Sequence, residues 1–217
     1  TQAEQSVTAE SAASGEKIVN VGVTDTLTSL NPLLLNGGEV NKYATGLMFL
    51  PLMELDADLN FVPMVADSIT TEDNLNFVVH IDEAATWSDG TPITTADVQF
   101  VADYSVYRYG YNRYIRVNGV DGSMNIVDDH TVQFILPEPY NYERVILAGM
   151  TLYPSHVFDG DPEALDNATT YYNTPGFVTS GPYTVTEINE DSFVCTARDD
   201  YYRGTPQVKT VVMKVIG

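Results

Sequence analysis

The segment Trp87-Ser-Asp-Gly-Thr-Pro-Ile-Thr-Thr-Ala-Asp-Val98 limits the possible local structure more strictly than any other part of the chain. The pair Asp89 and Gly90 favours a tight turn, and Pro92 fixes the backbone angle just after it. Thr94 and Asp97 have the spacing of a capping box, in which a hydroxyl and a carboxylate satisfy the first free amides of a helix. The segment therefore predicts a turn followed directly by a helix start.

The residues after this start favour an amphipathic helix over about residues 96–107. Val98, Val101, Ala102 and Ser105 recur at helical spacing and form one narrow stripe. A stripe of this kind predicts a helix that packs on a sheet.

Alternating apolar residues predict several strands. They are a strand at 17–23, a strand at 77–81, a hairpin of 124–127 with 131–136, a second hairpin of 183–188 with 192–197, and a final strand at 209–216. Helical spacing from Val40 to Met48, ended by Pro51, predicts a short helix, whereas residues 56–69 read as turn-rich and 159–175 as a short helix with loops. Because no repeat of fixed period is present, the fold class is α+β (mixed α/β).

Charge and composition exclude several partners. The 217-residue chain has 10 Lys and Arg against 30 Asp and Glu, a net charge of −20, which repels phosphate backbones and anionic lipid surfaces. Nucleic acid is therefore not an expected partner. Residues 1–17 hold few apolar side chains and are predicted to form a flexible tether.

Residue types for catalysis or metal binding are sparse. The three histidines, His80, His130 and His156, lie apart and no Gly-x-Ser-x-Gly motif accompanies them. The one cysteine, Cys195, lies in an alternating strand pattern typical of a buried structural thiol. We expect no enzyme activity, no cofactor and no metal. Calcium binding is the alternative interpretation of residues 56–60 and 159–163, where plain acidic turns are favoured.

Two segments have the composition of binding surfaces. Asn36, Gly37 and Gly38 precede the first helix and leave backbone amides open to a ligand, or form a plain connecting turn. Residues 104–114 contain five tyrosines, and Arg108, Arg113 and Arg116 lie in or near them. This second segment is either a recognition surface or a helix end whose rings cover the core.

Six motifs follow one another along the chain: Leu30-Asn-Pro32, Pro63-Met-Val-Ala66, the Trp87 to Val98 segment, Asp128-Asp-His-Thr-Val132, Thr179-Ser-Gly-Pro-Tyr183 and Asp199-Asp-Tyr-Tyr-Arg-Gly-Thr-Pro206. In kind and order they resemble the extracytoplasmic solute-binding proteins of family 5, which serve ABC importers of peptides, nickel and related solutes. The resemblance covers residues 17–217.

The resemblance implies a periplasmic-binding-protein type II-like fold that closes two lobes on a ligand. This chain would be the first lobe with an inserted subdomain, with the distal lobe missing. We expect residues 18–55 and 177–217 to form the sheet-based part of lobe I and residues 56–176 to form the inserted α+β subdomain. The tether would hold the protein outside the cell, lipid-anchored in the full precursor.

The function implied is capture of a short peptide or related small solute for an ABC permease in the membrane, without covalent chemistry. Asn36, Gly37 and Gly38 would contact the ligand backbone, and Tyr109 and Tyr111 would line the pocket. Nickel chelates and oligosaccharides are alternative ligands, and a sensing or adhesin-type surface protein is the alternative function. Unpaired sheet edges further predict that the fragment self-associates.

Overall fold

The structure is a computed structural model that describes residues 17–24, 29–33 and 38–216. Its helices are α1 (Gly38–Met48), α2 (Thr95–Tyr109), α3 (Glu143–Ala148), α4 (Pro162–Asp166) and α5 (Thr169–Tyr172), with a 3-10 turn at Ser155–Phe158. Its strands are β1 (Ile18–Val23), β2 (Met53–Leu55), β3 (Phe61–Pro63), β4 (Ala66–Thr70), β5 (Asn76–Ile81), β6 (Arg116–Val117), β7 (Val120–Asp121), β8 (Ser123–Ile126), β9 (Thr131–Ile135), β10 (Tyr183–Ile188), β11 (Ser192–Ala197) and β12 (Thr210–Val215).

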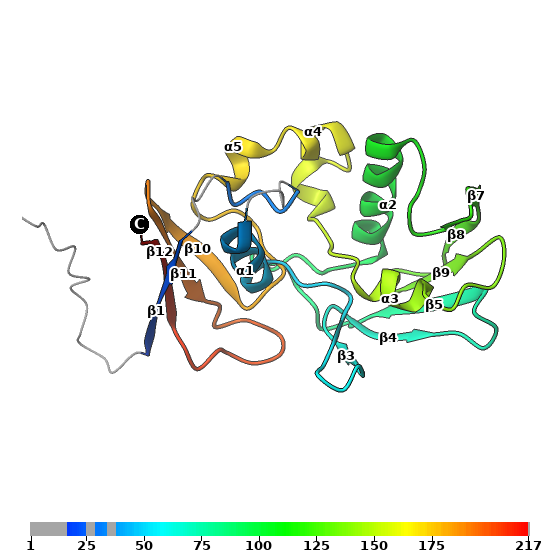
Figure 1. Ribbon diagram of the computed structural model, residues 1–217, viewed down its shortest axis with the longest axis horizontal. Helices are drawn as coiled ribbons and strands as arrows, with labels where there is room; N and C mark the ends of the chain where they lie inside the picture. Colours follow the sequence, from blue (N-terminus) through cyan, green and yellow to red (C-terminus); the bar gives the residue numbers. More distant parts are fainter. Residues whose placement is uncertain (1–16, 25–28, 34–37, 217) are drawn as a thin grey trace, which may run out of the picture.

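Two four-stranded sheets lie at opposite ends of the elongated molecule, with α1 between them (Figure 1). The first has the strand order β1-β12-β11-β10 and joins both ends of the chain, because β1 pairs in parallel with β12 from Ile18 opposite Thr210 onward. The β10–β11 hairpin confirms the predicted strands at 183–188 and 192–197.

The second sheet has the order β4-β5-β9-β8, and its neighbouring strands are antiparallel. Strands β8 and β9 confirm the predicted hairpin around residues 128–130. Residues 56–69, predicted to be turn-rich, also contain β3 and most of β4, which were not predicted. A register shift between Ala66 and Ser68 breaks the alternation of β4, so its period was not visible in the sequence.

Helix α2 confirms the predicted helix start. Thr94 accepts a hydrogen bond from the Ala96 amide and Asp97 accepts one from the Thr94 amide, so both halves of the capping box form. The helix ends at Gly110, whose φ of 79° is a left-handed conformation that suits glycine. Its predicted stripe, including Val98 and Ala102, is buried.

The buried apolar residues form two cores. One lies on the second sheet and includes Trp87, Phe77 and Phe134, and the other lies on the first sheet and includes Phe193 and Tyr172. Each core draws on both predicted parts of lobe I. The first also contains Leu50 and Leu52, while the second also contains Phe100 and Phe158. The division of the chain at residues 55/56 and 176/177 therefore stays a prediction.

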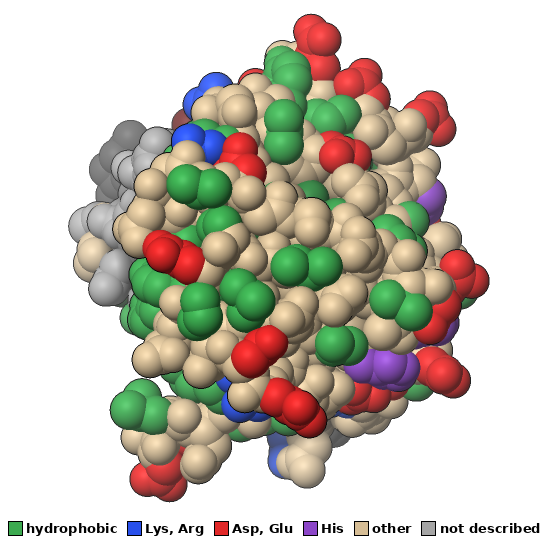
Figure 2. Space-filling model, turned by 90° about the vertical axis from the view of Figure 1, so that its right-hand side faces the viewer, with side chains coloured by type: hydrophobic (Ala, Val, Ile, Leu, Met, Phe, Trp, Pro, Cys, Tyr) green, Lys and Arg blue, Asp and Glu red, His purple; other side chains and the backbone are tan. Residues whose placement is uncertain are grey.

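Acidic side chains lie along much of the rim of the face in Figure 2, which looks at the end of the molecule that holds the second sheet. Few Lys or Arg side chains appear on this face. The distribution agrees with the net charge of −20.

Candidate functional site

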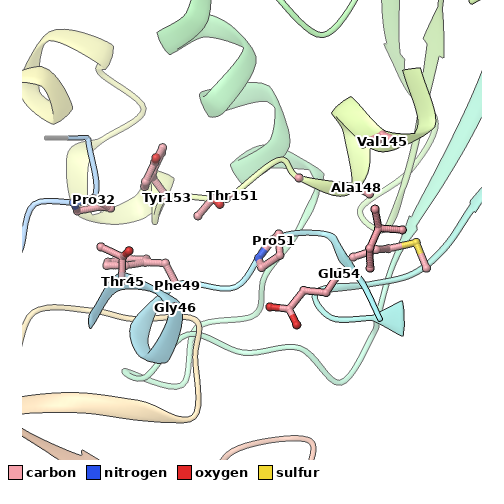
Figure 3. A pocket seen from close by; sticks show the side chains of 13 residues that line it. Pro32, Thr45, Gly46, Phe49, Pro51, Glu54, Val145, Ala148, Thr151 and Tyr153 are labelled. Carbon is pink, nitrogen blue, oxygen red and sulfur yellow. The ribbon is translucent and has the colours of Figure 1, made fainter. Parts of the chain in front are cut away.

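An apolar pocket of about 480 Å³ opens between the end of α1, the strand β2 and the helix α3. Figure 3 shows Phe49 and Thr45 on one side of this space and Tyr153 and Pro32 on the other. Its apolar and aromatic lining is Pro32, Phe49, Pro51, Met53, Leu55, Val145, Ala148 and Tyr153. A concave, mostly apolar surface of this size is typical of a small-molecule site.

A linking hollow of about 420 Å³ continues from the apolar pocket. The two share Val145, Gly149, Thr151 and Tyr153 in their linings, so they are neighbours on one surface. Both pockets lie along α3 and the segment that follows it.

A third space, which we call the arginine pocket, has a volume of about 570 Å³. It is lined by Tyr109, Tyr111, Arg113, Arg116, Gly119 and Ile146, of which Arg113 and Ile146 also line the linking hollow. The apolar pocket, the linking hollow and the arginine pocket therefore form one continuous row, which we call the cleft wall.

The two arginines of the arginine pocket have different environments. Arg116 forms an ion pair of 2.7 Å with Asp121 and stacks 4.6 Å from the centre of the Tyr111 ring. The guanidinium of exposed Arg113 lies 5.5 Å from the centre of the Tyr114 ring and has no carboxylate partner among the described residues. Arg113 is thus the freer cation of the pair.

Local hydrogen bonds hold this loop against α2. The hydroxyl of buried Ser105 donates to the Tyr111 carbonyl over 3.1 Å and accepts from the Arg113 amide over 3.0 Å. The side chain of Asn112 accepts from the Tyr114 amide over 3.0 Å. Because the left-handed Gly110 reverses the chain at the helix end, Tyr109 and Tyr111 come to lie with ring centres 6.2 Å apart.

The predicted site residues have different outcomes. Tyr109 and Tyr111 both line the arginine pocket, although their role toward a ligand stays a prediction. Asn36 and Gly37 lie outside the described residues. Gly38 is the first residue of α1, and its contact with a ligand likewise stays a prediction.

Sequence reasoning missed the centre of the cleft wall. Tyr153 lines the apolar pocket and the linking hollow, and burial raises the pKa of its phenol above the usual value, so it stays protonated. Thr151, two residues before Tyr153, also lines the apolar pocket, and Phe49 and Glu54 line it from the segment around Pro51. Their one sequence signal was the nearby Pro51 and Pro154, which gives no direction for a side chain.

The other polar groups weighed in the sequence lie elsewhere. His80 pairs with Asp67 over 3.1 Å and His156 with Asp89 over 2.8 Å, both partly exposed. Cys195 is buried in β11, and burial raises the pKa of its thiol to about 12, as a structural role predicts.

The acidic side chains of the turns at residues 56–60 and 159–163 accept hydrogen bonds from backbone amides of the same turns. One Asp56 oxygen accepts from the backbone amides of Asp58 over 2.9 Å and Asn60 over 2.8 Å. Asp161 caps α4 by accepting from the Glu163 amide. Among the side chains that the structure describes, no group of three His, Cys, Asp or Glu residues is placed to hold a metal ion.

Comparison with a family model decides the family. Residues 60–217 match the model described as "bacterial extracellular solute-binding proteins, family 5 Middle". The chain belongs to this family. The matched residues include the Trp87 to Val98 segment.

Individual relatives agree with the family. The chain is 29% identical over 197 residues to the peptidoglycan-binding protein YepA of Agrobacterium fabrum, covering 86% of this chain and 31% of the relative. It is 27% identical to the periplasmic oligopeptide-binding protein OppA of Escherichia coli, covering 86% and 36%. The chain thus spans about a third of the length of these curated relatives.

A solved structure has the same fold. The oligopeptide-binding protein AppA of Bacillus subtilis, in complex with a nonapeptide, superposes with a TM-score of 0.73 at 25% identity. The match covers 93% of this chain and 41% of AppA. It supports a periplasmic-binding-protein type II fold of which this chain forms a part.

The family description places its members outside the cell. Among the described residues, no helix has the length and apolar character needed to cross a membrane.

Proposed function

We propose that this chain supplies one wall of the ligand cleft in the substrate-binding component of an ABC importer for short peptides or a related small solute. The cleft wall carries this proposal, because a continuous row of cavities that joins an apolar pocket to one lined by tyrosines and arginines suits a small ligand with apolar and polar parts. A distal lobe would close over the ligand, and the closed form would dock on a membrane permease. No covalent chemistry is needed.

Peptides are the first ligands to test. The E. coli relative is named an oligopeptide-binding protein, and AppA holds a nonapeptide. The Agrobacterium relative is named a peptidoglycan-binding protein, so peptides derived from the cell wall belong in the same test. Nickel chelates and oligosaccharides are the alternative ligands, and a surface sensor that uses the same cleft is the alternative function.

The test is isothermal titration of the protein expressed from its complete gene against mixtures of short peptides. A leucine in place of Gly46 places a side chain in the apolar pocket, and a Cβ at this helical position meets no atom within 4 Å. Gly46→Leu should therefore fold normally and weaken peptide binding about tenfold or more. Tyr43→Leu is the control, since Tyr43 is exposed on the same helix and lies outside the cleft wall lining.

Two results would contradict the proposal. If no peptide mixture gives a heat of binding but a nickel chelate or an oligosaccharide does, then the ligand belongs to that other class and the peptide proposal is wrong. Equal peptide affinity in wild type and Gly46→Leu would remove the apolar pocket from the site.

The location and assembly of the protein are part of the same proposal. We expect it outside the cytoplasmic membrane and held there by a lipid anchor in the precursor. For the chain alone we expect self-association, because Ile18 and Val19 on the outer strand β1 are 44% and 41% exposed. Light scattering that finds a strict monomer at high concentration would contradict this.

A further inference from the structure

We infer that the tip of the β2–β3 hairpin is a docking element, which packs on an apolar surface of the distal lobe when the two lobes close. We call residues 55–62 the hairpin tip. The inference rests on the proposed function and adds to it a contact between lobes that lies outside the ligand cavities. An exposed apolar surface, a backbone held in an unfavourable conformation and the place of the hairpin beside the apolar pocket support it.

The hairpin tip exposes three apolar side chains. Leu59 is 74% exposed, more than any other large apolar side chain among the described residues, and Leu55 and Val62 are exposed as well. Within the described part of the chain, none of the three packs against either apolar core. The hairpin projects from the middle of the molecule at the lower edge of the view in Figure 1. Several apolar side chains gathered on one projecting element are typical of an interaction site.

The turn holds Leu59 in an unfavourable backbone conformation. Its φ of 64° is left-handed, where the Cβ of a leucine lies too close to the neighbouring carbonyl. The turn is fixed, because the Leu59 amide donates to the Asp56 carbonyl over 3.0 Å and the Asp56 carboxylate accepts from the amides of Asp58 and Asn60. Among the described residues, no packing of the Leu59 side chain offsets this cost. Strain at an exposed side chain is typical of a residue that acts in binding.

The base of the hairpin is anchored by two other segments. The guanidinium of Arg144 on α3 lies 4.6 Å from the centre of the Phe61 ring. The hydroxyl of Tyr202, which follows β11, donates to the Met64 carbonyl over 2.6 Å. The hairpin tip is therefore carried on a fixed support, and a contact with it needs little further ordering of the chain.

The neighbouring pocket indicates what the hairpin tip packs against. Leu55 lines the apolar pocket, and Val62 lies opposite Glu54, which lines it too. A lobe that covers this pocket also covers the adjoining hairpin tip. The curated relatives are about three times as long as this chain, which leaves room for such a lobe. A second copy fits less well, because a symmetric contact through the tip brings Asp56 and Asp58 close to the same acids of the other copy.

The experiment uses the protein expressed from its complete gene, with the photoreactive amino acid p-benzoylphenylalanine at position 59. Irradiation should give an intramolecular cross-link from position 59 to a residue beyond 217, and a saturating peptide mixture should raise its yield severalfold. Val127 is the control position, since it is exposed between β8 and β9 and does not line the cleft wall. A cross-link between two molecules, or none beyond residue 217, would overturn the inference.

A substitution measures what the contact contributes. Asparagine adopts the left-handed conformation more readily than leucine, so Leu59→Asn should fold at least as well as wild type. Its peptide affinity should fall about tenfold, because the apolar contact made in the closed form is lost. Val127→Asn should bind like wild type. Equal peptide affinity in Leu59→Asn and wild type would contradict the docking role and leave peptide binding in place. If no peptide binds the wild-type protein, the peptide proposal fails, whereas the cross-link without peptide still decides the contact of the hairpin tip.

Discussion

The Nη2 atom of Arg198 donates a hydrogen bond of 2.9 Å to the backbone carbonyl of Trp87. The same guanidinium donates to the carbonyls of Thr86 over 3.2 Å and Gly181 over 3.3 Å, and it forms an ion pair with Asp200. Arg198 is 4% exposed and follows β11 of the first sheet, whereas Trp87 belongs to the core on the second. One buried side chain therefore joins the two halves of the molecule.

Replacing Arg198 should weaken this junction. In Arg198→Met the carbonyls of Thr86, Trp87 and Gly181 lose a buried donor, so we expect the free energy of unfolding to fall by about 3 kcal/mol. Urea unfolding measures the change. Arg108→Met, at an exposed position on α2, should stay close to wild type, and a loss below about 1 kcal/mol in Arg198→Met would contradict the role of Arg198.

Asp97 is a second junction, because its carboxylate accepts four hydrogen bonds. The donors are the Trp87 indole, the Thr94 amide, and both the amide and the hydroxyl of Ser155, at distances of 2.7 to 3.2 Å. An asparagine can accept with one oxygen only, and its NH₂ group would face donors. Asp97→Asn should therefore lower the free energy of unfolding by about 2 to 4 kcal/mol.

The fluorescence of Trp87, the chain's one tryptophan, reports on this change directly. Asp103→Asn is the control, since the Asp103 carboxylate lies on the exposed side of α2 and accepts from Gln99. An unaltered emission maximum and unfolding midpoint in Asp97→Asn would show that the Trp87 contact is dispensable.

Glu143 should make stability depend on pH. Its side chain is 1% exposed, and burial raises the pKa of its carboxyl from 4.5 to about 7. A raised pKa in the folded state means that the neutral form is favoured there. Its stabilising contribution is complete below about pH 4.5 and is lost as the pH rises through about 7.

Glu143→Gln keeps the shape and removes the titration. We expect this variant to be more stable than wild type above about pH 7 by on the order of 2 kcal/mol, and to match it near pH 4.5. Unfolding midpoints across this pH range test the expectation. Glu72→Gln at an exposed site should not change the pH profile, and a parallel pair of profiles for Glu143→Gln and wild type would count against the buried acid.

Replacement by alanine should change the free energy of unfolding in opposite directions at Gly181 and Gly46. A Cβ at Gly181 would clash with the backbone carbonyl of Leu47, where the Gly181 amide donates to the Met48 carbonyl over 2.7 Å. Gly181→Ala should cost about 1 to 3 kcal/mol, because backbone atoms must move apart. Gly46→Ala has open space and a helical position, so it should stabilise by about 0.5 to 1 kcal/mol. Thermal melting compares the two, and equal melting temperatures would be evidence against the close approach at Gly181.

The sequence alone determined the elements whose signals are local. The β10–β11 hairpin follows from alternation over a few residues on each side of a polar turn, and α2 begins where Thr94 and Asp97 form a capping box. The tyrosines and arginines of the arginine pocket were visible for the same reason, since Tyr109, Tyr111 and Arg113 lie close together in the chain. Short-range geometry needs no knowledge of the rest of the fold.

Only the tertiary structure decided what lies opposite these elements. Three relationships join segments far apart in sequence: the parallel pairing of β1 with β12, the hydrogen bonds from Arg198 to the carbonyls of Thr86, Trp87 and Gly181, and the meeting of Glu54 with Tyr153 in the apolar pocket. β4 stayed hidden because a bulge breaks its period. Such contacts form because burying two apolar cores brings distant segments together, and no pattern within one segment records which partner it will meet.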